Sequence, residues 1–317
     1  MTQFVMLVGL PASGKSTYSD VFTKFGYTIH SSDAIREELF GNQGDQSDHQ
    51  LVFNTLHKRI KEDLKAGRST VYDATNISAK RRMAFLREIE RYNAETACFF
   101  IATPYQECIE RDKNREYSVG EDVIKRMYMS FWVPHYYEGW DKIEILWSSP
   151  LAENNINDIL KTLEDYDQKT PFHTLSLDQH MEETYNWAFN DIVEKGLRPR
   201  DFENILLAIR IHDMGKPFTQ GYNAEKDRHT YYQHQHVGAY DALFYLRDLH
   251  HFTPIIHDFV GAPKTDKDVL EIANYIQWHM YPYDIKQEST REKFKGTVGE
   301  ELYDSLMFFH EADRAGH

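Results

Sequence analysis

The sequence predicts two domains of different class: an α/β domain with a parallel sheet covered by helices on both faces, and then an all-α domain. Up to residue 147, short strands alternate with helices, which is the pattern of a parallel sheet. After Pro150 the strand signals stop, and from Leu177 onward the pattern is helical. The segment "DQKTPFHTLSLD" at 167–178 has a proline break and indicates a linker. We therefore expect domains at 1–168 and 172–317, which suits a chain of 317 residues.

The expected elements follow in order, without an internal repeat or a low-complexity tract. The strands of the first domain are expected at 4–8, 27–30, 70–73, 96–102 and 142–147. The helices up to the linker are expected at 15–25, 33–40, 51–66, 79–92, 105–114, 121–131 and 156–166. The helices of the second domain are expected at 178–194, 201–211, 234–249, 269–279 and 300–313.

The composition excludes some classes of protein. A net charge of −14 argues against a protein that coats duplex nucleic acid, because such binding depends on many phosphate contacts, but it allows an enzyme that grips only a strand end. No apolar run approaches the ~18 residues of a membrane span, and the N-terminus lacks the basic start of a signal peptide. Cys98 and Cys108 make no disulfide framework, so we expect core or helix-face cysteines in a cytoplasmic protein away from membranes.

The stretch "GLPASGKST" after the first strand fits the phosphate-loop pattern G-x-x-x-x-G-K-[ST]. In such a loop the backbone amides face the phosphates, the lysine reaches the terminal ones, and the serine holds Mg²⁺. The alternative, a glycine-rich turn without a ligand, is disfavoured because an apolar strand precedes the loop and a helix follows it. We therefore expect ATP with Mg²⁺ to be bound by Gly9, Pro11, Ala12, Ser13, Gly14, Lys15, Ser16 and Thr17, with Ser16 on the metal.

The segment "SSDAIREELFG" places Asp33 just after the second strand and Arg36 one turn later. A carboxylate there can accept the proton of an acceptor hydroxyl, and the arginine can hold an acceptor phosphate. Alternatively, Asp33 is only the N-cap of its helix, because aspartate is common at that position. After a phosphate loop we favour the general base.

Two further segments complete the expected kinase site. In "VYDATNISAKRR" the strand ends at Asp73, where an acid commonly orients the metal ion or its water. Arg111 and Arg115 are spaced i,i+4 on one predicted helix, as in a lid that closes cations over the transferring phosphoryl group. A solvated basic face is an equal alternative for Arg111, whereas Arg115 is the stronger candidate.

Together, the phosphate loop, S-x-D-x-x-R, DATN, R-x-x-x-R and "FWVPHYYEGWDKI" (131–143) resemble the P-loop polynucleotide 5′-kinase family over residues 1 to about 150. The resemblance implies that Asp33 is the general base, Arg36 the acceptor-phosphate arginine and Arg115 the lid arginine. Related small-molecule kinases share the loop and the lid, so the acceptor stays open between a strand end and a small molecule.

The second half carries histidines and acids within or at the ends of its predicted helices. Imidazole and carboxylate ligands together suit Mn, Fe, Co, Ni or Zn rather than Ca. Neighbouring residues diverge by about 100° around a helix, so two in sequence share an ion only if it lies close to that helix. The candidates are His180, His212, Asp213, His234, His279 and Asp313.

The order H…HD-x-G-K…H-x-x-x-G-A…H…D resembles the HD phosphohydrolase superfamily over residues 172–317. The resemblance implies a first metal on His180, His212, Asp213 and Asp313, with His234 and His279 supplying a second ion and Asp213 bridging the two. It also suggests that Lys216 neutralises a bound phosphate. His236 is left without a role. His310 lies one helical turn before Asp313 and could add a ligand, but we expect it to be a surface residue.

A different phosphatase chemistry is possible at "EDYDQKT" (164–170), which offers the D-x-D of enzymes with a carboxylate nucleophile. That motif needs an apolar strand before it, and "NINDILKTLE" is helical and charged. We expect any phosphate removal to be metal–water chemistry.

The two halves make sense together if they act on different groups. A broken strand with a 5′-hydroxyl and a 3′-phosphate needs a phosphate added at one end and removed at the other before a ligase can join it. The sequence thus predicts an end-healing enzyme that acts on RNA or DNA. The alternatives are a small-molecule or nucleoside kinase fused to an HD nucleotide phosphohydrolase, and a regulatory protein in which a nucleotide-sensing module gates a P-loop switch.

Overall fold

The computed structural model describes residues 1–148, 156–170, 174–247 and 264–316, and it divides into two compact units. The first unit comprises Met1–Tyr128 and Pro134–Pro150, and the second comprises Met129–Val133 and Leu151–His317. Part of the expected linker, 171–173, and the end of the helix expected at 234–249 lie outside the described residues.

Residues 156–168 were expected in the first domain and lie in the second unit. Two hydrogen bonds explain this placement. The backbone carbonyl of Tyr166 accepts from the Leu177 amide at 3.0 Å, and the Gln168 side chain accepts from Lys216 Nζ at 2.6 Å. Both partners belong to the second unit, so the chain is already part of that unit before the expected linker begins.

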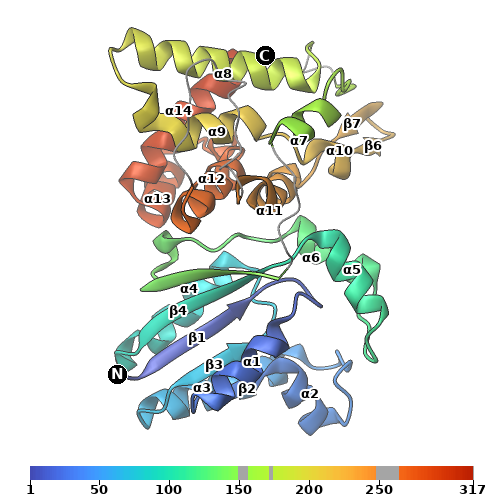
Figure 1. Cartoon of the computed structure of the whole chain (residues 1–317), viewed down its shortest axis with the longest axis vertical. Coiled ribbons are helices and arrows are strands. Elements are labelled where there is room, and N and C mark those ends of the chain that lie inside the picture. Colours follow the sequence, from blue (N-terminus) through green and yellow to red (C-terminus); the bar gives the residue numbers. More distant parts are fainter. Residues whose placement is uncertain (149–155, 171–173, 248–263, 317) are drawn as a thin grey trace. The chain divides into compact units, whose positions relative to one another are not determined.

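The first unit contains a five-stranded parallel sheet in the order β2-β3-β1-β4-β5 (Figure 1). Val5 pairs with Val71 on one side and with Ala97 on the other, which makes β1 central. In a parallel sheet the carboxyl ends of adjacent strands meet at one edge, so the segments after β1 and β3 are neighbours. The strands are β1 (Gln3–Val8), β2 (Thr28–Ser31), β3 (Thr70–Asp73), β4 (Glu95–Ala102) and β5 (Lys142–Trp147).

Helices surround this sheet, and one side of its core is an apolar cluster of Val5, Leu7, Val71 and Ile101 against Tyr18 and Phe22 of the first helix. The predicted α/β class with a parallel sheet is confirmed. The helical segments are α1 (Lys15–Lys24), α2 (Ser32–Phe40), α3 (His49–Lys65), α4 (Ala79–Ile89), η1 (Glu90–Tyr92), α5 (Tyr105–Lys113), α6 (Glu121–Met129) and η2 (Tyr136–Glu138).

The helix expected at 121–131 ends two residues early, because the next residues pack into the second unit. The Gln277 side chain accepts from the Val133 amide at 2.9 Å and donates to the Phe131 carbonyl at 2.6 Å. Trp132 packs against Trp278 with ring centroids 4.5 Å apart. Buried backbone groups need partners, and one glutamine supplies two of them.

The second unit is mainly helical, as predicted. Its elements are α7 (Ile156–Thr162), α8 (Leu177–Glu194), η3 (Pro199–Phe202), α9 (Glu203–Ile211), α10 (Lys216–Thr219), β6 (Gly221–Asn223), β7 (Arg228–Thr230), α11 (His234–Leu246), α12 (Asp266–Trp278), η5 (Tyr281–Asp284), α13 (Glu288–Val298) and α14 (Glu300–Ala315). Helix α13 was missed by the sequence analysis. A helix, α7, precedes the D-x-D segment, which therefore lacks the strand that its alternative chemistry requires.

The expectation of an all-α domain is wrong in one place, where β6 and β7 form an antiparallel hairpin. Tyr222 and His229 face each other across it with ring centroids 5.5 Å apart. The Asn223 side chain accepts from the Lys226 amide at 3.0 Å, and Asp227 adopts φ 45° in the turn. Cross-strand ring contacts and Asn/Asp turn chemistry favour a hairpin in this stretch, where the sequence analysis expected neither a helix nor a strand.

Candidate functional site

The phosphate loop connects β1 to the N-terminus of α1, and at each of its two motif glycines the local structure disfavours a side chain. A Cβ on Gly9 would lie 2.6 Å from Ser13 Oγ and 3.0 Å from the Ile101 carbonyl. Gly14 has φ +102°, a conformation that side chains disfavour. The loop can therefore curl tightly enough to aim backbone amides and the helix N-terminus at an anion.

Lys15 and Asp73 place opposite charges at the carboxyl ends of the adjacent strands β1 and β3. Lys15 Nζ donates to the carbonyls of Gly9 at 3.1 Å and Leu10 at 2.6 Å. Burial lowers the pKa of Lys15, and the nearby Asp73 carboxylate opposes that shift. Burial likewise raises the pKa of Asp73, which accepts a hydrogen bond from Ser19 Oγ at 2.8 Å. Ser16 follows Lys15 in the first turn of α1, where it is exposed.

The alternative that Asp33 caps its helix is wrong. The N-cap of α2 is Ser31, whose hydroxyl accepts from the Asp33 amide at 3.3 Å. The Asp33 carboxylate accepts from Arg36 Nη1 at 2.6 Å, and its side chain is 51% exposed whereas that of Arg36 is 9% exposed. Arg36 Nε is buried without a hydrogen-bond partner among the described residues. The pair thus presents an accessible carboxylate beside a partly unsatisfied guanidinium.

The two lid arginines do not share a helix face as expected, because α5 ends at Lys113 and Arg115 lies beyond it. Arg111 is the one that contacts the phosphate loop, where Nη1 donates to the Ser13 carbonyl at 3.2 Å. Arg115 is 38% exposed, with Nη1 3.8 Å from Asp112 Oδ1. Of the two alternatives for Arg111, a solvated basic face does not describe its position.

A buried ion pair that the sequence analysis missed supports the segment after β3. The Arg82 guanidinium donates to both oxygens of Glu138 at 2.7 and 2.5 Å, and Nη1 donates to the Asn76 carbonyl at 2.8 Å. Trp140 Nε1 also donates to Glu138, at 3.0 Å. Both charged side chains are at most 1% exposed. Breaking such a pair leaves an uncompensated buried charge, so we expect it to hold the strand end rigidly.

In the second unit, the six predicted metal ligands lie together although they come from five helical segments; His234 joins the other five through Nε2, at 3.3 Å from His279 Nε2. His180 is on α8, His212 and Asp213 follow α9, His234 begins α11, His279 follows α12, and Asp313 is on α14. All six side chains are buried.

The Asp213 carboxylate is at the centre of this cluster, with histidine Nε2 atoms near each of its oxygens. Oδ2 lies 3.3 Å from His212 and 3.6 Å from His180, while Oδ1 lies 3.0 Å from His234 and 3.8 Å from His279. Asp313 Oδ1 joins the first pair, at 3.1 Å from His180 and 3.4 Å from His212. The donors therefore form two groups that share Asp213.

The four imidazoles are oriented by backbone carbonyls. Their Nδ1 atoms lie 2.6–3.0 Å from carbonyl oxygens, and because a carbonyl can only accept, each Nδ1 must carry the proton. In the neutral rings this leaves the lone pairs of all four Nε2 atoms pointing at one another and at the carboxylates. The carbonyls belong to Gly316, Ile209, Tyr231 and Ile276 for His180, His212, His234 and His279 respectively.

Such a convergence of acceptors demands positive charge. Burial lowers the pKa of His212, but Asp213 and Asp313 outweigh it and raise that pKa to about 10. Burial and the neighbouring histidines lower the pKa of His279 to about 3. Among the described residues His212 Nε2 has no hydrogen-bond partner. The donor set and the carbonyl-oriented rings fit a divalent transition metal, because metal-bound histidines characteristically donate their other nitrogen in this way.

Lys216 differs from its expected role. Its Nζ lies 2.6 Å from Asp213 Oδ2 and 2.6 Å from Gln168 Oε1, and the side chain is buried. This lysine therefore compensates the charge of Asp213 directly.

At two glycines near the cluster there is no space for a side chain. A Cβ on Gly215 would lie 2.2 Å from the His234 carbonyl, and one on Gly316 would lie 2.2 Å from Thr184 Oγ1. Gly215 thus lets the turn after His212 and Asp213 approach the start of α11. Gly316, whose carbonyl orients His180, was not singled out by sequence.

The comparisons with known proteins concern mainly the first unit. Residues 4–134 match the model of a family described as the AAA domain. The chain is 26% identical over 147 residues to L-seryl-tRNA(Sec) kinase of Methanococcus maripaludis, covering 44% of this chain and 57% of that protein. It is 25% identical over 160 residues to transcription factor bHLH140 of Arabidopsis thaliana, covering 48% of this chain and 17% of that protein.

The first unit is a P-loop domain of the kinase type. The chain spans about half the length of the seryl-tRNA kinase and a smaller part of the transcription factor. Among solved structures, the Pnkp1/Rnl/Hen1 RNA repair complex is 21% identical with a TM-score of 0.35, covering 41% of this chain and 43% of that one. A putative kinase from Chloroflexus aurantiacus is 14% identical with a TM-score of 0.40, covering 51% and 93%. No helix among the described residues is long and apolar enough to cross a membrane.

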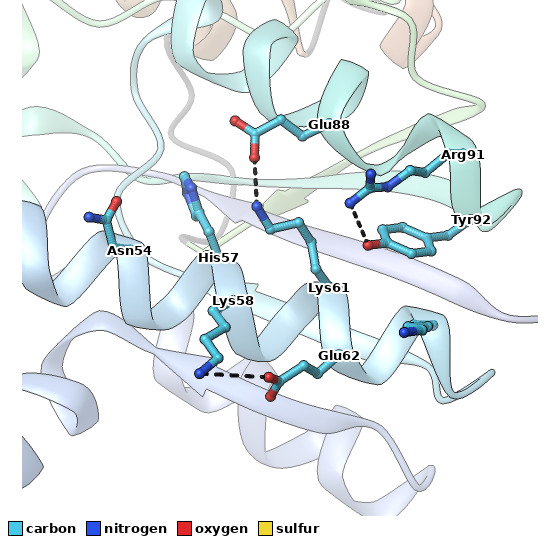
Figure 2. Close-up of a pocket in the computed structure, with 9 residues that line it drawn as sticks. Asn54, His57, Lys58, Lys61, Glu62, Glu88, Arg91 and Tyr92 are labelled. Atoms are coloured by element: carbon cyan, nitrogen blue, oxygen red, sulfur yellow. Dashed lines mark hydrogen bonds and ion pairs between the residues drawn. The ribbon is translucent and has the colours of Figure 1, made fainter.

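A groove of about 440 Å³ lies elsewhere on the first unit, between α3 and the end of α4 (Figure 2). Lys61 pairs with Glu88 at 3.0 Å across it, and Arg91 donates to the Tyr92 hydroxyl at 2.9 Å. Its lining shares no residue with the phosphate loop, the Asp33–Arg36 pair or the lid arginines.

His236, which was left without a role, is outside the metal-ligand cluster but buried beside it. Its Nδ1 lies 2.7 Å from Gln277 Nε2, which can only donate, and its ring packs edge-on against Trp132. Burial lowers the pKa of His236 to about 4 from an ordinary value of 6.5. The neutral ring is therefore part of the packing of the second unit.

We expect His236 to make the protein less stable in acid. A pKa depressed on folding contributes stability that is complete above pH 6.5 and is lost as pH falls from 6.5 through 4, because the unfolded chain binds the proton first. Urea unfolding of the wild type and of His236→Gln between pH 7 and 4 measures this slope. The wild type should lose more free energy of unfolding than the variant; equal slopes would contradict a buried neutral His236.

Proposed function

We propose that this chain is a nucleic acid end-healing enzyme that phosphorylates 5′-hydroxyl ends with ATP and removes 3′-phosphate ends with a divalent transition metal. The observation that carries the proposal is the convergence of four histidine Nε2 atoms on the two oxygens of Asp213, in a unit separate from the P-loop domain. A kinase and a phosphohydrolase acting on the same group would only waste ATP. Acting on opposite ends of a break, they prepare the strand for a ligase.

In the first unit, Asp33 is the proposed general base. Its exposed carboxylate would accept the proton of the 5′-hydroxyl as that oxygen bonds to the γ-phosphorus and ADP leaves. Arg36 Nη1 donates to this carboxylate at 2.6 Å, and its buried Nε, which has no hydrogen-bond partner among the described residues, would donate to an acceptor phosphate after a movement of the side chain.

Lys15 and the loop amides would hold the terminal phosphates of ATP. Ser16 and Asp73 offer the oxygen ligands that Mg²⁺ prefers, with Asp73 at the end of β3. Arg111, which donates to the Ser13 carbonyl of the phosphate loop, would place a cation beside the transferring phosphoryl group when the lid closes. Arg115, which lies beyond the end of α5, would place a second cation there.

In the second unit, His180, His212, Asp213 and Asp313 would hold one ion, and His234, His279 and Asp213 would hold a second. A divalent ion bound there supplies Lewis-acid chemistry toward a phosphate ester and a water. The chain's own contribution is to fix the four imidazoles by their Nδ1 hydrogen bonds and to compensate Asp213 with Lys216. Burial raises the pKa of the Asp213 and Asp313 carboxyls, but the neighbouring histidines, and Lys216 in the case of Asp213, outweigh it and hold both pKa values well below the ordinary value, so both groups are ionised at neutral pH.

The two activities should be separable by single substitutions. Lys15→Met removes the cation that serves the terminal phosphates, and Asp213→Asn removes the shared anionic ligand. We expect Lys15→Met to lose 5′-phosphorylation but release 3′-phosphate normally, and Asp213→Asn to show the reverse. The measurement is product analysis of an oligonucleotide with a 5′-hydroxyl and a 3′-phosphate, in Mg-ATP with Mn²⁺ or Ni²⁺.

The predictions for the kinase and for the phosphatase can each be contradicted separately. Loss of both activities in a folded single variant would argue against two separate sites. Phosphorylation of free nucleosides in preference to the oligonucleotide would show instead a nucleoside kinase, and hydrolysis that ceases without ATP would point to a regulatory protein.

Asp33→Asn tests the base. The amide cannot accept the proton, so the 5′-kinase rate should fall by ~10²–10⁴. The measurement is single-turnover transfer to a 5′-hydroxyl oligonucleotide, with Asp122→Asn, an exposed acid on α6, as the matched control. A rate within a few-fold of the control would remove Asp33 from the mechanism.

A further inference from the structure

Tyr283 connects the metal-ligand cluster to the surface of the second unit. It lies in η5, the short turn that follows His279, and its hydroxyl donates to Asp313 Oδ2 at 2.9 Å. The other oxygen of Asp313 faces His180 and His212. One end of the phenol is therefore anchored on the cluster itself.

The ring of Tyr283 contacts a neighbouring histidine, and the residue remains partly exposed to solvent. The edge of His310 packs against it, with ring centroids 4.3 Å apart and an interplanar angle of 84°. Tyr283 nevertheless remains 37% exposed, and Met280, directly after His279, is 36% exposed. A tyrosine whose hydroxyl is anchored and which stays partly exposed offers a rigid planar surface at low entropic cost.

The charge of the second unit limits what this surface can recognise. Residues 129–133 and 151–317 contain 29 acidic and 17 basic side chains, and nearly all of the net charge of −14 lies there. Lys216, the cation at the cluster, is already engaged by Asp213 and Gln168. A strand cannot gain much from phosphate contacts on such a surface, whereas the stacking of a base on an aromatic ring is uncharged.

We propose that Tyr283 is the stacking surface for the terminal nucleobase of the strand whose 3′-phosphate enters the metal-ligand cluster. This rests on the phosphatase function proposed above and deepens it, because it makes the second unit select nucleotides over other phosphate monoesters. The hydroxyl orients Asp313, and the ring binds the leaving nucleoside. The two roles belong to different parts of one side chain, so they can be separated.

Two substitutions make that separation. Tyr283→Phe keeps the ring and removes the hydroxyl, while Tyr283→Leu removes both. Tyr222→Leu, at a 58% exposed tyrosine on the β6–β7 hairpin, is the control for loss of a surface tyrosine. Each variant is assayed in Mn²⁺ with a 3′-phosphate oligonucleotide and with glycerol phosphate, which has no base.

Stacking contributes ~1–3 kcal/mol per base, so Tyr283→Leu should raise KM for the oligonucleotide about tenfold relative to Tyr283→Phe. The two variants should have the same kcat and the same KM for glycerol phosphate. If Tyr283→Leu and Tyr283→Phe have the same KM for the oligonucleotide as well as for glycerol phosphate, Tyr283 only positions Asp313 and the inference is wrong. If the wild type releases phosphate from neither substrate, the proposed phosphatase itself fails.

A binding measurement tests the ring without catalysis. A 3′-hydroxyl oligonucleotide with 2-aminopurine as its last base should lose fluorescence on binding to the wild type and to Tyr283→Phe, because stacking quenches it. Tyr283→Leu should leave the fluorescence of the last base high at saturating protein. Equal quenching by Tyr283→Leu and by the wild type would place the terminal base elsewhere.

Discussion

The Asp213 carboxylate is the group on which the second unit depends. It lies buried among four imidazoles whose Nδ1 atoms are all committed to backbone carbonyls. Three of the carbonyls lie three residues before the histidine that they orient, whereas the carbonyl that orients His180 belongs to Gly316, at the end of α14. Close packing at Gly215 and Gly316 brings the segments that carry the ligands together. The two buried carboxylates of the cluster need positive charge beside them, and Lys216 supplies one such charge to Asp213.

The two units handle phosphate by opposite electrostatics. The first holds Lys15 and Arg111 at a loop of backbone amides, which suits a site that binds a polyanion. The second is acidic, and under the proposed function it would bind a phosphate only through metal ions held by its own carboxylates and imidazoles. This division accounts for a strongly negative chain whose proposed substrate is nucleic acid.

Local motifs predicted the positions of the phosphate loop, Asp73 and the six clustered histidines and acids, because each motif sets a backbone shape or a ligand within a few residues. Contacts between distant segments were not predictable. Arg82 and Glu138 are far apart in sequence, and neither has a local signature. The end of α6 depends on Gln277, and the hairpin depends on a ring pair across two three-residue strands. The capping of α2 by Ser31 and the end of α5 at Lys113 are matters of one or two residues, which helical periodicity cannot determine.

The central claim is that Asp213 joins two groups of metal ligands. Its most direct test is the metal content of the purified full chain, stripped with a chelator, reloaded with Mn²⁺ or Ni²⁺ and passed through a desalting column. Elemental analysis should find tightly bound metal in the wild type and in Lys15→Met, and a marked loss in Asp213→Asn with the fold intact by circular dichroism. A wild type that retains no metal, or an Asp213→Asn variant that retains as much as the wild type, would contradict the account.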